Sequence, residues 1–384
     1  MALKGLYIRH QLRGFQARRC AANFVSSPAA VQFPPAGALR AGCTHHSTTC
    51  DPDSATSFTP AKQLGDFPVL RHVINHYPLS PDMHAGIATF MRLPHVTLDD
   101  AKDLDIGLVG IPWDGGTTNR PGPRHGPRQL RDASTMIRAQ HGITGVRPFE
   151  ALNCADLGDV APNPADVQDS LHRMTAFYAR VRAANITPLT AGGDHLCTLP
   201  ILRALAHDRP LGMIHFDSHT DLFHSYFNGM MYTHGTPFRR AVEEGLLDPK
   251  RICMIGIRGT AYDSEDRDFA RAEGIRVIPI EEFHKRGVED VMEEARAIAG
   301  TGETYVSYDI DFVDPAYAPG TGTPEVGGPN SWQALECARL LAGVKIVGAD
   351  LVEVSPPFDP SGGTAFLGAS LMFEMLCAIV QAQI

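Results

Sequence analysis

The chain has 384 residues, of which 43% are hydrophobic and 20% charged, a composition that excludes a disordered or fibrous protein and suits one large α/β domain or two smaller ones. Its net charge of −9 argues against a nucleic-acid-binding protein, because contact with phosphates requires a basic surface. The charge is unevenly spread, since residues 1–50 contain six basic residues and no Asp or Glu, which leaves −15 for residues 51–384.

The beginning of the chain has the composition of a targeting segment. Residues 1–35 combine spaced arginines and serines with no acidic residue, which predicts a mitochondrial transit peptide and a protein of the mitochondrial matrix. A basic tail without a targeting role is the alternative. Residues 36–62, rich in Pro, Ser, Thr and Ala, are expected to be a flexible linker, so that residues 63–384 form a single folded domain. Eight cysteines without a Cys-x-x-Cys pair predict reduced thiols rather than a disulfide framework.

Beyond the linker, short apolar runs alternate with helical patterns. Strands are expected at 106–111, 152–156, 187–191, 212–216, 252–257, 276–280, 305–309 and 346–352. Helices are expected at 165–184, 196–206, 263–273, 289–299, 332–342 and 365–382, with Asn330–Ser331 and Thr364 at N-cap positions. The last helix is strongly apolar, but Glu374 interrupts it, which favours a buried core helix over a membrane span. The alternation predicts a mostly parallel eight-stranded sheet with helices on both faces.

Polar residues follow three of these strands at the point where each strand ends. Gly-Gly-Asp-His follows the strand at 187–191, Asp-x-His-x-Asp follows the strand at 212–216, and Asp-x-Asp closes the strand at 305–309. Residues two apart in an extended segment point the same way, so each motif can direct its side chains to one place. The side chains concerned are His195, Asp217, His219, Asp221, Asp309 and Asp311.

Several buried carboxylates at one place repel each other and need a cation between them. Arg258 is the only arginine directly after a strand end, which is too little positive charge for so many acids. Divalent metal ions are therefore expected, and a site of carboxylates and imidazoles without thiolates favours Mn²⁺ over structural Zn²⁺. A single Asp or His after a strand is usually a helix cap or a structural hydrogen-bonding group, but three strand ends with the same residue types argue against that reading. For Asp194, a cap remains as good an interpretation as a metal role.

These motifs resemble those of the ureohydrolase family of arginases, agmatinases and guanidino acid hydrolases. The resemblance rests on residues 192–195, 217–221, 307–315 and 319–324, together with 110–112 and 122–127, and is closest to the mitochondrial guanidino acid hydrolase, or agmatinase-like, branch. It implies a three-layer arginase-like fold and two Mn²⁺ ions per subunit. One ion would be held by His195, Asp217, Asp221 and Asp309, and the other by His219, Asp217, Asp309 and Asp311. Ser218 stands where the family commonly has Ala, and we expect it to point away from the metals.

The resemblance also implies a reaction and the residues that perform it. A guanidinium carbon is a poor electrophile, and metal ions lower the pKa of bound water enough to supply a strong nucleophile at neutral pH. His234 matches the family's proton-shuttling histidine, and Glu353 matches its guanidinium-binding carboxylate, although either could be merely structural. There is no Walker A and no Gly-x-Ser-x-Gly motif.

The substrate's tail is judged from the residues near the motifs. Phe223 stands where arginases have an Asn, which argues against an arginase. The segment 222–233 contains no acid and offers His224 and Asn228, while Arg124 is a possible partner for an anion. These residues favour guanidino acids such as 4-guanidinobutyrate, with agmatine as the alternative substrate. The sequence has all six candidate metal ligands, which is less consistent with an inactive regulatory binder or with a deacylase that uses a single zinc ion. The resemblance implies a homo-oligomer, a trimer or hexamer, and we expect neither a nucleic-acid nor a membrane partner.

Overall fold

The computed structural model of the protein describes residues 83–84 and 86–383. The expected transit peptide (1–35) and linker (36–62) lie outside the described residues. All described residues belong to one compact unit.

One eight-stranded sheet organises the fold, and every pair of neighbouring strands in it is parallel. Its strands in chain order are β1 (Ile106–Gly110), β2 (Cys154–Asp159), β3 (Thr187–Ala191), β4 (Leu211–Phe216), β5 (Leu247–Ile257), β6 (Arg276–Pro279), β7 (Thr304–Asp309) and β8 (Ile346–Val352). Their spatial order is β2-β1-β3-β8-β7-β4-β5-β6. The predicted eight-stranded α/β sheet is confirmed, and it is parallel throughout.

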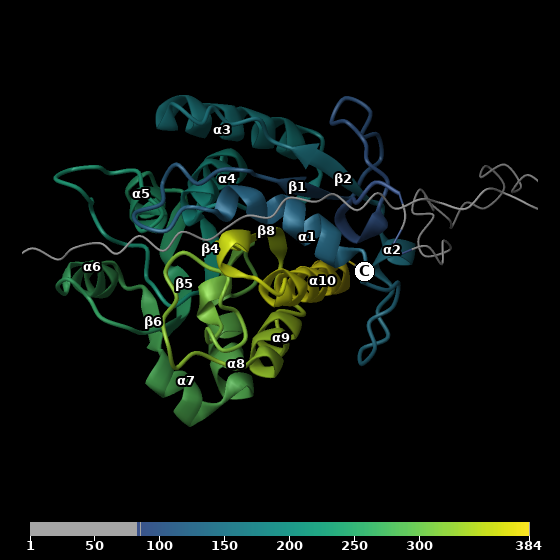
Figure 1. The fold of residues 1–384 in the computed structure, drawn as a ribbon. Helices are drawn as coiled ribbons and strands as arrows, with labels where there is room; N and C mark the ends of the chain where they lie inside the picture. Colours follow the sequence, from purple (N-terminus) through teal and green to yellow (C-terminus); the bar gives the residue numbers. More distant parts are fainter. Residues whose placement is uncertain (1–82, 85, 384) are drawn as a thin grey trace, which may run out of the picture. The chain divides into compact units, whose positions relative to one another are not determined.

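The helices cover both faces of the sheet. In chain order they are α1 (Gly126–Ser134), α2 (Pro148–Ala151), α3 (Val167–Ala183), α4 (Thr198–Leu205), α5 (Pro237–Glu243), α6 (Glu265–Glu273), α7 (Ile280–Arg286), α8 (Val288–Ala299), α9 (Ser331–Arg339) and α10 (Gly363–Gln383). Figure 1 shows α3 and α4 on one side of the sheet and α8, α9 and α10 on the other. The fold therefore has three layers.

Two apolar clusters separate these layers, because successive side chains of a strand point to opposite faces. In β7, Tyr305 belongs to the cluster shared with α3, α4 and α5, whereas Val306 and Tyr308 belong to the cluster shared with α8, α9 and α10. Strands buried on both faces are nearly continuous apolar runs, as parallel sheets covered by helices require. Three polar residues inside these runs, His215, Ser307 and Asp350, are therefore conspicuous.

The predicted helices are present, but the sequence pattern did not indicate α1, α2, α5 and α7. These helices have four to nine residues, and α1, α2 and α5 have Pro in their first turn, so they resemble loops in sequence. Asn330 caps α9 in a capping box with Gln333, as expected. Thr364 is not the cap of α10. The carboxylate of Asp359 instead accepts hydrogen bonds from the backbone N–H groups of Thr364 and Ala365.

Helix α10 is long and apolar enough to cross a membrane by length and composition alone. However, 83% of its most apolar window is buried in the protein. Its side chains pack against α1, α9 and β8, and this packing explains the apolar composition of a core helix.

Candidate active site

The spatial order of the strands brings the predicted motifs together. Strands β3, β8, β7 and β4 are neighbours in that order at the centre of the sheet, and all four end at the same edge. His195 follows β3, Glu353 follows β8, and Asp309 ends β7. The segment Asp217 to Asp221 follows β4. Three of these adjacent strand ends supply all six predicted ligands and the fourth supplies Glu353, in the crevice where parallel α/β sheets bind their ligands.

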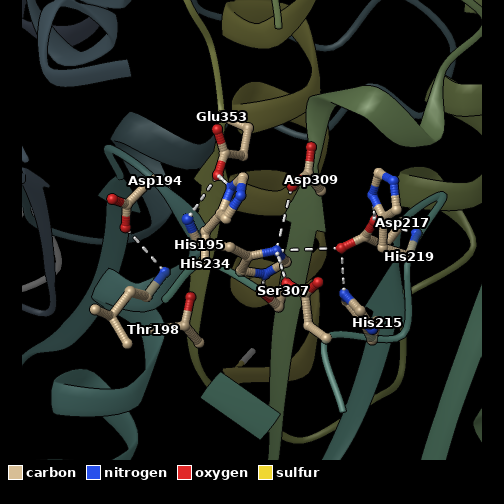
Figure 2. A network of polar contacts seen from close by, with 12 residues as sticks. Asp194, His195, Thr198, His215, Asp217, His219, His234, Ser307, Asp309 and Glu353 are labelled. Carbon is tan, nitrogen blue, oxygen red and sulfur yellow. Dashed lines mark hydrogen bonds and ion pairs between the residues drawn. The ribbon is translucent and has the colours of Figure 1, made fainter. Parts of the chain in front are cut away.

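His195 lies at the first cluster of carboxylates. Its Nδ1 atom is 3.1 Å from Asp217 Oδ2, 3.0 Å from Asp221 Oδ2 and 3.2 Å from Asp309 Oδ2. Figure 2 shows the imidazole directed between Asp217 and Asp309. The Nδ1 atom is buried and makes no hydrogen bond to any residue that the structure describes. A buried nitrogen without a hydrogen bond, at similar distances from three carboxylate oxygens, is the arrangement expected of a metal ligand.

His219 lies at the second cluster. Its Nδ1 atom is 3.4 Å from Asp217 Oδ1 and 3.1 Å from Asp311 Oδ2. Asp217 thus directs one oxygen to each histidine, which suits a carboxylate that bridges two ions. His219 is also the most exposed of the predicted ligands, because its side chain faces the cavity described below.

The electrostatics of the cluster favour a bound cation. Burial, followed by the negative charges of Asp311 and Asp217, raises the pKa of Asp309 well above its usual value. Burial and the Asp217 carboxylate likewise raise the pKa of Asp221. These carboxylates repel each other when all of them are ionised, and a divalent ion between them reduces this repulsion. The donor set of four carboxylates and two imidazoles fits divalent metal ions.

A buried polar network orients His195 from behind. The Ser307 hydroxyl donates to Asp350 Oδ1 at 2.7 Å and lies 2.8 Å from His195 Nε2. Because the Ser307 proton goes to Asp350, the network favours a protonated Nε2 that donates to Ser307, which leaves the Nδ1 lone pair for a metal. Thr198 and Tyr305 donate to the other oxygen of Asp350.

Sequence reasoning missed this network, although its signals were present. Ser307 lies two residues before Asp309 and therefore on the same side of the strand. Asp350 is an acid in the middle of a strand that is otherwise apolar. His215 lies two residues before Asp217, and its Nε2 atom is 2.9 Å from Asp217 Oδ2 (Figure 2).

The backbone turns sharply at two residues of the site, Asp221 and Glu353. Asp221 and Glu353 have φ angles of 54° and 61°, in the left-handed region that non-glycine residues seldom adopt. Such strain is kept where the surrounding structure holds it, and here it aims both carboxylates into the site. The backbone N–H of Glu353 donates to Gly193 O at 2.8 Å, which fixes the turn. Gly193 has no room for a side chain, because a Cβ there would lie 1.7 Å from Trp113 O.

Glu353 and His234 form a buried pair next to the ligands. His234 Nδ1 donates to Glu353 Oε1 at 2.9 Å, and the same oxygen accepts from the backbone N–H of His195 at 3.0 Å (Figure 2). Burial lowers the pKa of His234, but the Glu353 charge and hydrogen bond outweigh it and raise that pKa to about 9. The second oxygen, Oε2, is buried and has no hydrogen-bond partner among the described residues.

A cavity of about 500 Å³ opens over this pair and the predicted ligands. Its walls include Thr118, Arg120, Phe223, Tyr226, Arg267 and Glu325. Arg124, His224 and Asn228 were expected to contact the substrate, but none of them lines this cavity. Arg124 forms an ion pair with Asp114, and His224 accepts a hydrogen bond from Arg240 through its Nδ1. Both side chains therefore hold loops together.

Asp194 and Ser218 lie next to predicted ligands in the sequence. Asp194 caps the helical turn that starts at His195, since its Oδ1 accepts from Leu196 N at 3.1 Å, which agrees with the cap interpretation. Ser218 was expected to point away from the ligands, and this is wrong. Its hydroxyl donates to Asp311 Oδ1 at 2.8 Å, because the chain leaves the extended conformation directly after β4.

Residues 104–377 of the chain match the arginase family. A guanidinopropionase from Pseudomonas aeruginosa is 56% identical to the chain, over 78% of this chain and 93% of the relative. The mitochondrial guanidino acid hydrolase of Homo sapiens is 45% identical, over 83% and 89% of the two chains. The mitochondrial agmatinase of Gallus gallus is 48% identical, over 77% and 86%.

Solved structures agree with these relatives. The fold is similar to that of proclavaminate amidino hydrolase from Streptomyces clavuligerus, with a TM-score of 0.75 and 39% identity, over 78% of this chain and 99% of the other. The sequence match, the shared three-layer architecture and the cluster of aspartates and histidines at the central strand ends lead to one conclusion. The chain belongs to the arginase family and is an enzyme that acts on guanidino carbon–nitrogen bonds.

Proposed function

We propose that the protein hydrolyses the guanidino group of linear guanidino acids, such as 4-guanidinobutyrate, to urea and the corresponding amino acid. One observation carries the proposal most directly. Glu353 Oε2 is a buried acceptor with no hydrogen-bond partner in the described part of the chain, and Glu353 lines the cavity beside the predicted metal ligands. A guanidinium ion, with its planar set of N–H donors, supplies the partner that this oxygen lacks.

The cofactor we propose is a pair of Mn²⁺ ions in each subunit. His195, Asp217, Asp221 and Asp309 would hold one ion, and His219, Asp217, Asp309 and Asp311 would hold the other. The absence of thiolates and the excess of carboxylates favour Mn²⁺ over Zn²⁺. When bound, the ions supply Lewis acidity that lowers the pKa of water, and so make a nucleophile available at neutral pH.

The protein's own residues then orient the substrate and deliver a proton. Glu353 binds the guanidinium N–H groups and holds the central carbon over the site. After water adds to that carbon, the bond to the alkyl-substituted nitrogen breaks, and this nitrogen must gain a proton to leave as an amine. His234 lies beside Glu353, is mostly protonated below pH 9, and is suited to donate that proton.

One arginine in the cavity wall, Arg120, is available for a carboxylate at the far end of a substrate. Arg258 donates to the backbone carbonyls of Gly256, Asp311 and Glu325, and Arg267 pairs with its neighbour Asp266. Arg120, by contrast, forms no ion pair within the described residues and stacks on Phe358, 3.7 Å from the ring centroid. We propose Arg120 in place of Arg124 as the partner of the substrate carboxylate.

Agmatine is the alternative substrate, and the similarity to an agmatinase favours it. The two candidates differ at the tail, which is an ammonium in agmatine and a carboxylate in a guanidino acid. The test is urea release from a panel of 3-guanidinopropionate, 4-guanidinobutyrate, arginine and agmatine, with the purified enzyme in added Mn²⁺. We expect the highest kcat/KM for a guanidino acid. A higher value for agmatine than for every guanidino acid would contradict the proposed substrate class.

A matched pair of variants sharpens this experiment. Arg120→Met should raise KM for the preferred guanidino acid and leave agmatine hydrolysis unchanged or improved, because the methionine keeps the stem and removes the charge. Arg267→Met is the control, since its guanidinium already has Asp266 beside it.

We also propose that the enzyme works in the mitochondrial matrix as a homo-oligomer, a trimer or hexamer. The mitochondrial relatives and the composition of residues 1–35 support the location, and the resemblance to ureohydrolases supports the assembly. Import into isolated mitochondria and sedimentation of the purified protein test these two statements.

A further inference from the structure

Thr118 lies in the loop between β1 and α1. It contacts the His234 ring on the side opposite Glu353. Its hydroxyl oxygen lies 2.8 Å from His234 Nε2, and its backbone nitrogen lies 3.2 Å from the same atom. Both nitrogens of the imidazole are therefore engaged, Nδ1 by Glu353 and Nε2 by Thr118. The ring is also almost completely buried.

The loop that carries Thr118 is itself fixed to the site. The backbone N–H of His234 donates to Gly116 O at 2.9 Å, and the N–H of Gly116 donates to Asp194 Oδ2 at 2.6 Å. Asp194 N in turn donates to Trp113 O at 2.8 Å. Asp194, Gly116 and His234 thus form a chain of contacts that keeps Thr118 at a constant distance from the imidazole.

Thr118 can bond Nε2 whether or not this nitrogen carries a proton. When Nε2 is unprotonated, the backbone N–H and the hydroxyl of Thr118 can both donate to it. When Nε2 carries a proton, only the hydroxyl oxygen can accept it, because the backbone N–H has no acceptor atom. The hydroxyl is therefore the group that serves both states, while Nδ1–H stays on Glu353 throughout.

We propose that Thr118 is a positioning residue that holds the His234 imidazole in one orientation before and after the Nε2 proton moves from its hydrogen bond with the Thr118 hydroxyl to the nitrogen of the leaving amine. The proposal rests on the proposed function, in which His234 protonates the leaving amine. A histidine held on one side alone could rotate after each proton transfer, whereas one held on both sides is ready for the next. The charged groups that face His234 are Glu353, Asp194 and Asp221.

The neighbouring residue offers a matched control. Thr117 has the same side chain, but its hydroxyl is buried and makes no hydrogen bond to the residues that the structure describes. Removing that hydroxyl changes the composition of the loop in the same way and leaves His234 untouched. A difference between the two positions therefore reports the contact with the histidine.

The experiment compares Thr118→Val, Thr118→Ser and Thr117→Val as Mn²⁺-loaded enzymes, on the substrate that the wild type hydrolyses best. We expect Thr118→Val to lower kcat about three- to tenfold, the range set by losing one hydrogen bond, with little change in KM or metal content. Thr118→Ser should restore kcat, and Thr117→Val should match the wild type. The alkaline limb of kcat/KM should move to lower pH in Thr118→Val only, because the protonated ring loses its acceptor.

Three results would overturn the proposal: a kcat for Thr118→Val within twofold of the wild type, a Thr118→Ser variant as slow as Thr118→Val, or an equal loss in Thr117→Val. If Thr118→Val does not fold, Thr118→Ala replaces it, judged by the same criteria. If the wild type releases urea from no guanidino compound, the proposed function has failed. Thr118 is then tested by NMR titration of ¹³C-labelled histidines in the Mg²⁺-loaded protein, where Thr118→Val should lower the pKa of His234, and an unchanged pKa would refute its role.

Discussion

Glu353 uses its two carboxylate oxygens for different purposes. Oε1 accepts hydrogen bonds from His234 and from the backbone of His195, and so ties His234 to the segment after β3. Oε2 has no partner among the described residues and is free for the substrate. A residue with one oxygen committed and one available can bind a guanidinium without giving up its own support.

We therefore expect Glu353→Gln to lose most urea release while the protein keeps its metal ions. Removing one charge of a buried pair costs about 2 kcal/mol or more, which corresponds to a fall in kcat/KM of at least about thirtyfold. The measurements are steady-state kinetics and metal content by atomic spectroscopy. Glu325→Gln, in the wall of the same cavity, is the control. Normal turnover in Glu353→Gln would refute the assignment.

His234 sets an expected pH dependence. Its pKa is raised to about 9, so most of it is protonated, and able to act as an acid, below that value. The kcat/KM for the best substrate should therefore fall as the pH rises through about 9. His234→Asn should be slower and should lack this alkaline limb. An identical limb in the variant would assign it to another group.

At the scale of single elements, short loops and caps decide where side chains point. The turn after β8 places Glu353 in the left-handed region, and the loop before α1 carries both Thr118 and Arg120 to the cavity. Helix α9 has a different kind of support. It begins at a capping box formed by Asn330 and Gln333.

Asn330→Ala should destabilise the protein by about 1 kcal/mol, because the backbone N–H of Gln333 loses its acceptor. The shift should be visible in the urea midpoint at an unchanged denaturant slope. Ser331→Ala, at the next position, is the control, since the cap bond comes from Asn330. Equal stability of the wild type and Asn330→Ala would mean that the capping box contributes nothing.

At the scale of the whole molecule, the acidic cluster links metal binding to stability. Carboxylates from β4 and β7 are held together in the interior, and their repulsion opposes folding until a cation is bound. The five cysteines within the described residues are buried and unpaired. In this part of the chain, no disulfide therefore adds stability that could compensate for the repulsion.

Removing the metals should therefore lower the thermal midpoint by several degrees. A ligand present at a hundred times its dissociation constant stabilises the folded state by about 2.7 kcal/mol. Differential scanning fluorimetry before and after chelation, followed by return of Mn²⁺, measures the effect. Chelator already saturated with Mn²⁺ is the control. The same midpoint in all samples would argue against a metal site in this cluster.

Much of the site could be predicted from the sequence because its geometry is local. The candidate ligands lie at or directly after the ends of buried strands, and five of the six belong to Asp-x-His-x-Asp and Asp-x-Asp, motifs short enough to be recognised whatever the rest of the fold does. The eight strands were also predictable, since parallel strands covered on both faces are apolar runs. The cap at Asn330 depends on three neighbouring residues and was predictable for the same reason.

Only the tertiary structure decided which of these local features meet. The order β3-β8-β7-β4 makes the four functional strand ends neighbours, and this order depends on pairing between residues that lie from 42 (Thr304 with Ile346) to 160 (Leu189 with Ala349) positions apart. The path of the loop after β1 directs Arg124 to Asp114 and leaves Arg120 in the cavity, although the two arginines are four residues apart. Local spacing determined the chemistry that each segment can offer, whereas contacts between distant segments determined that Glu353, His234 and Thr118 serve one site.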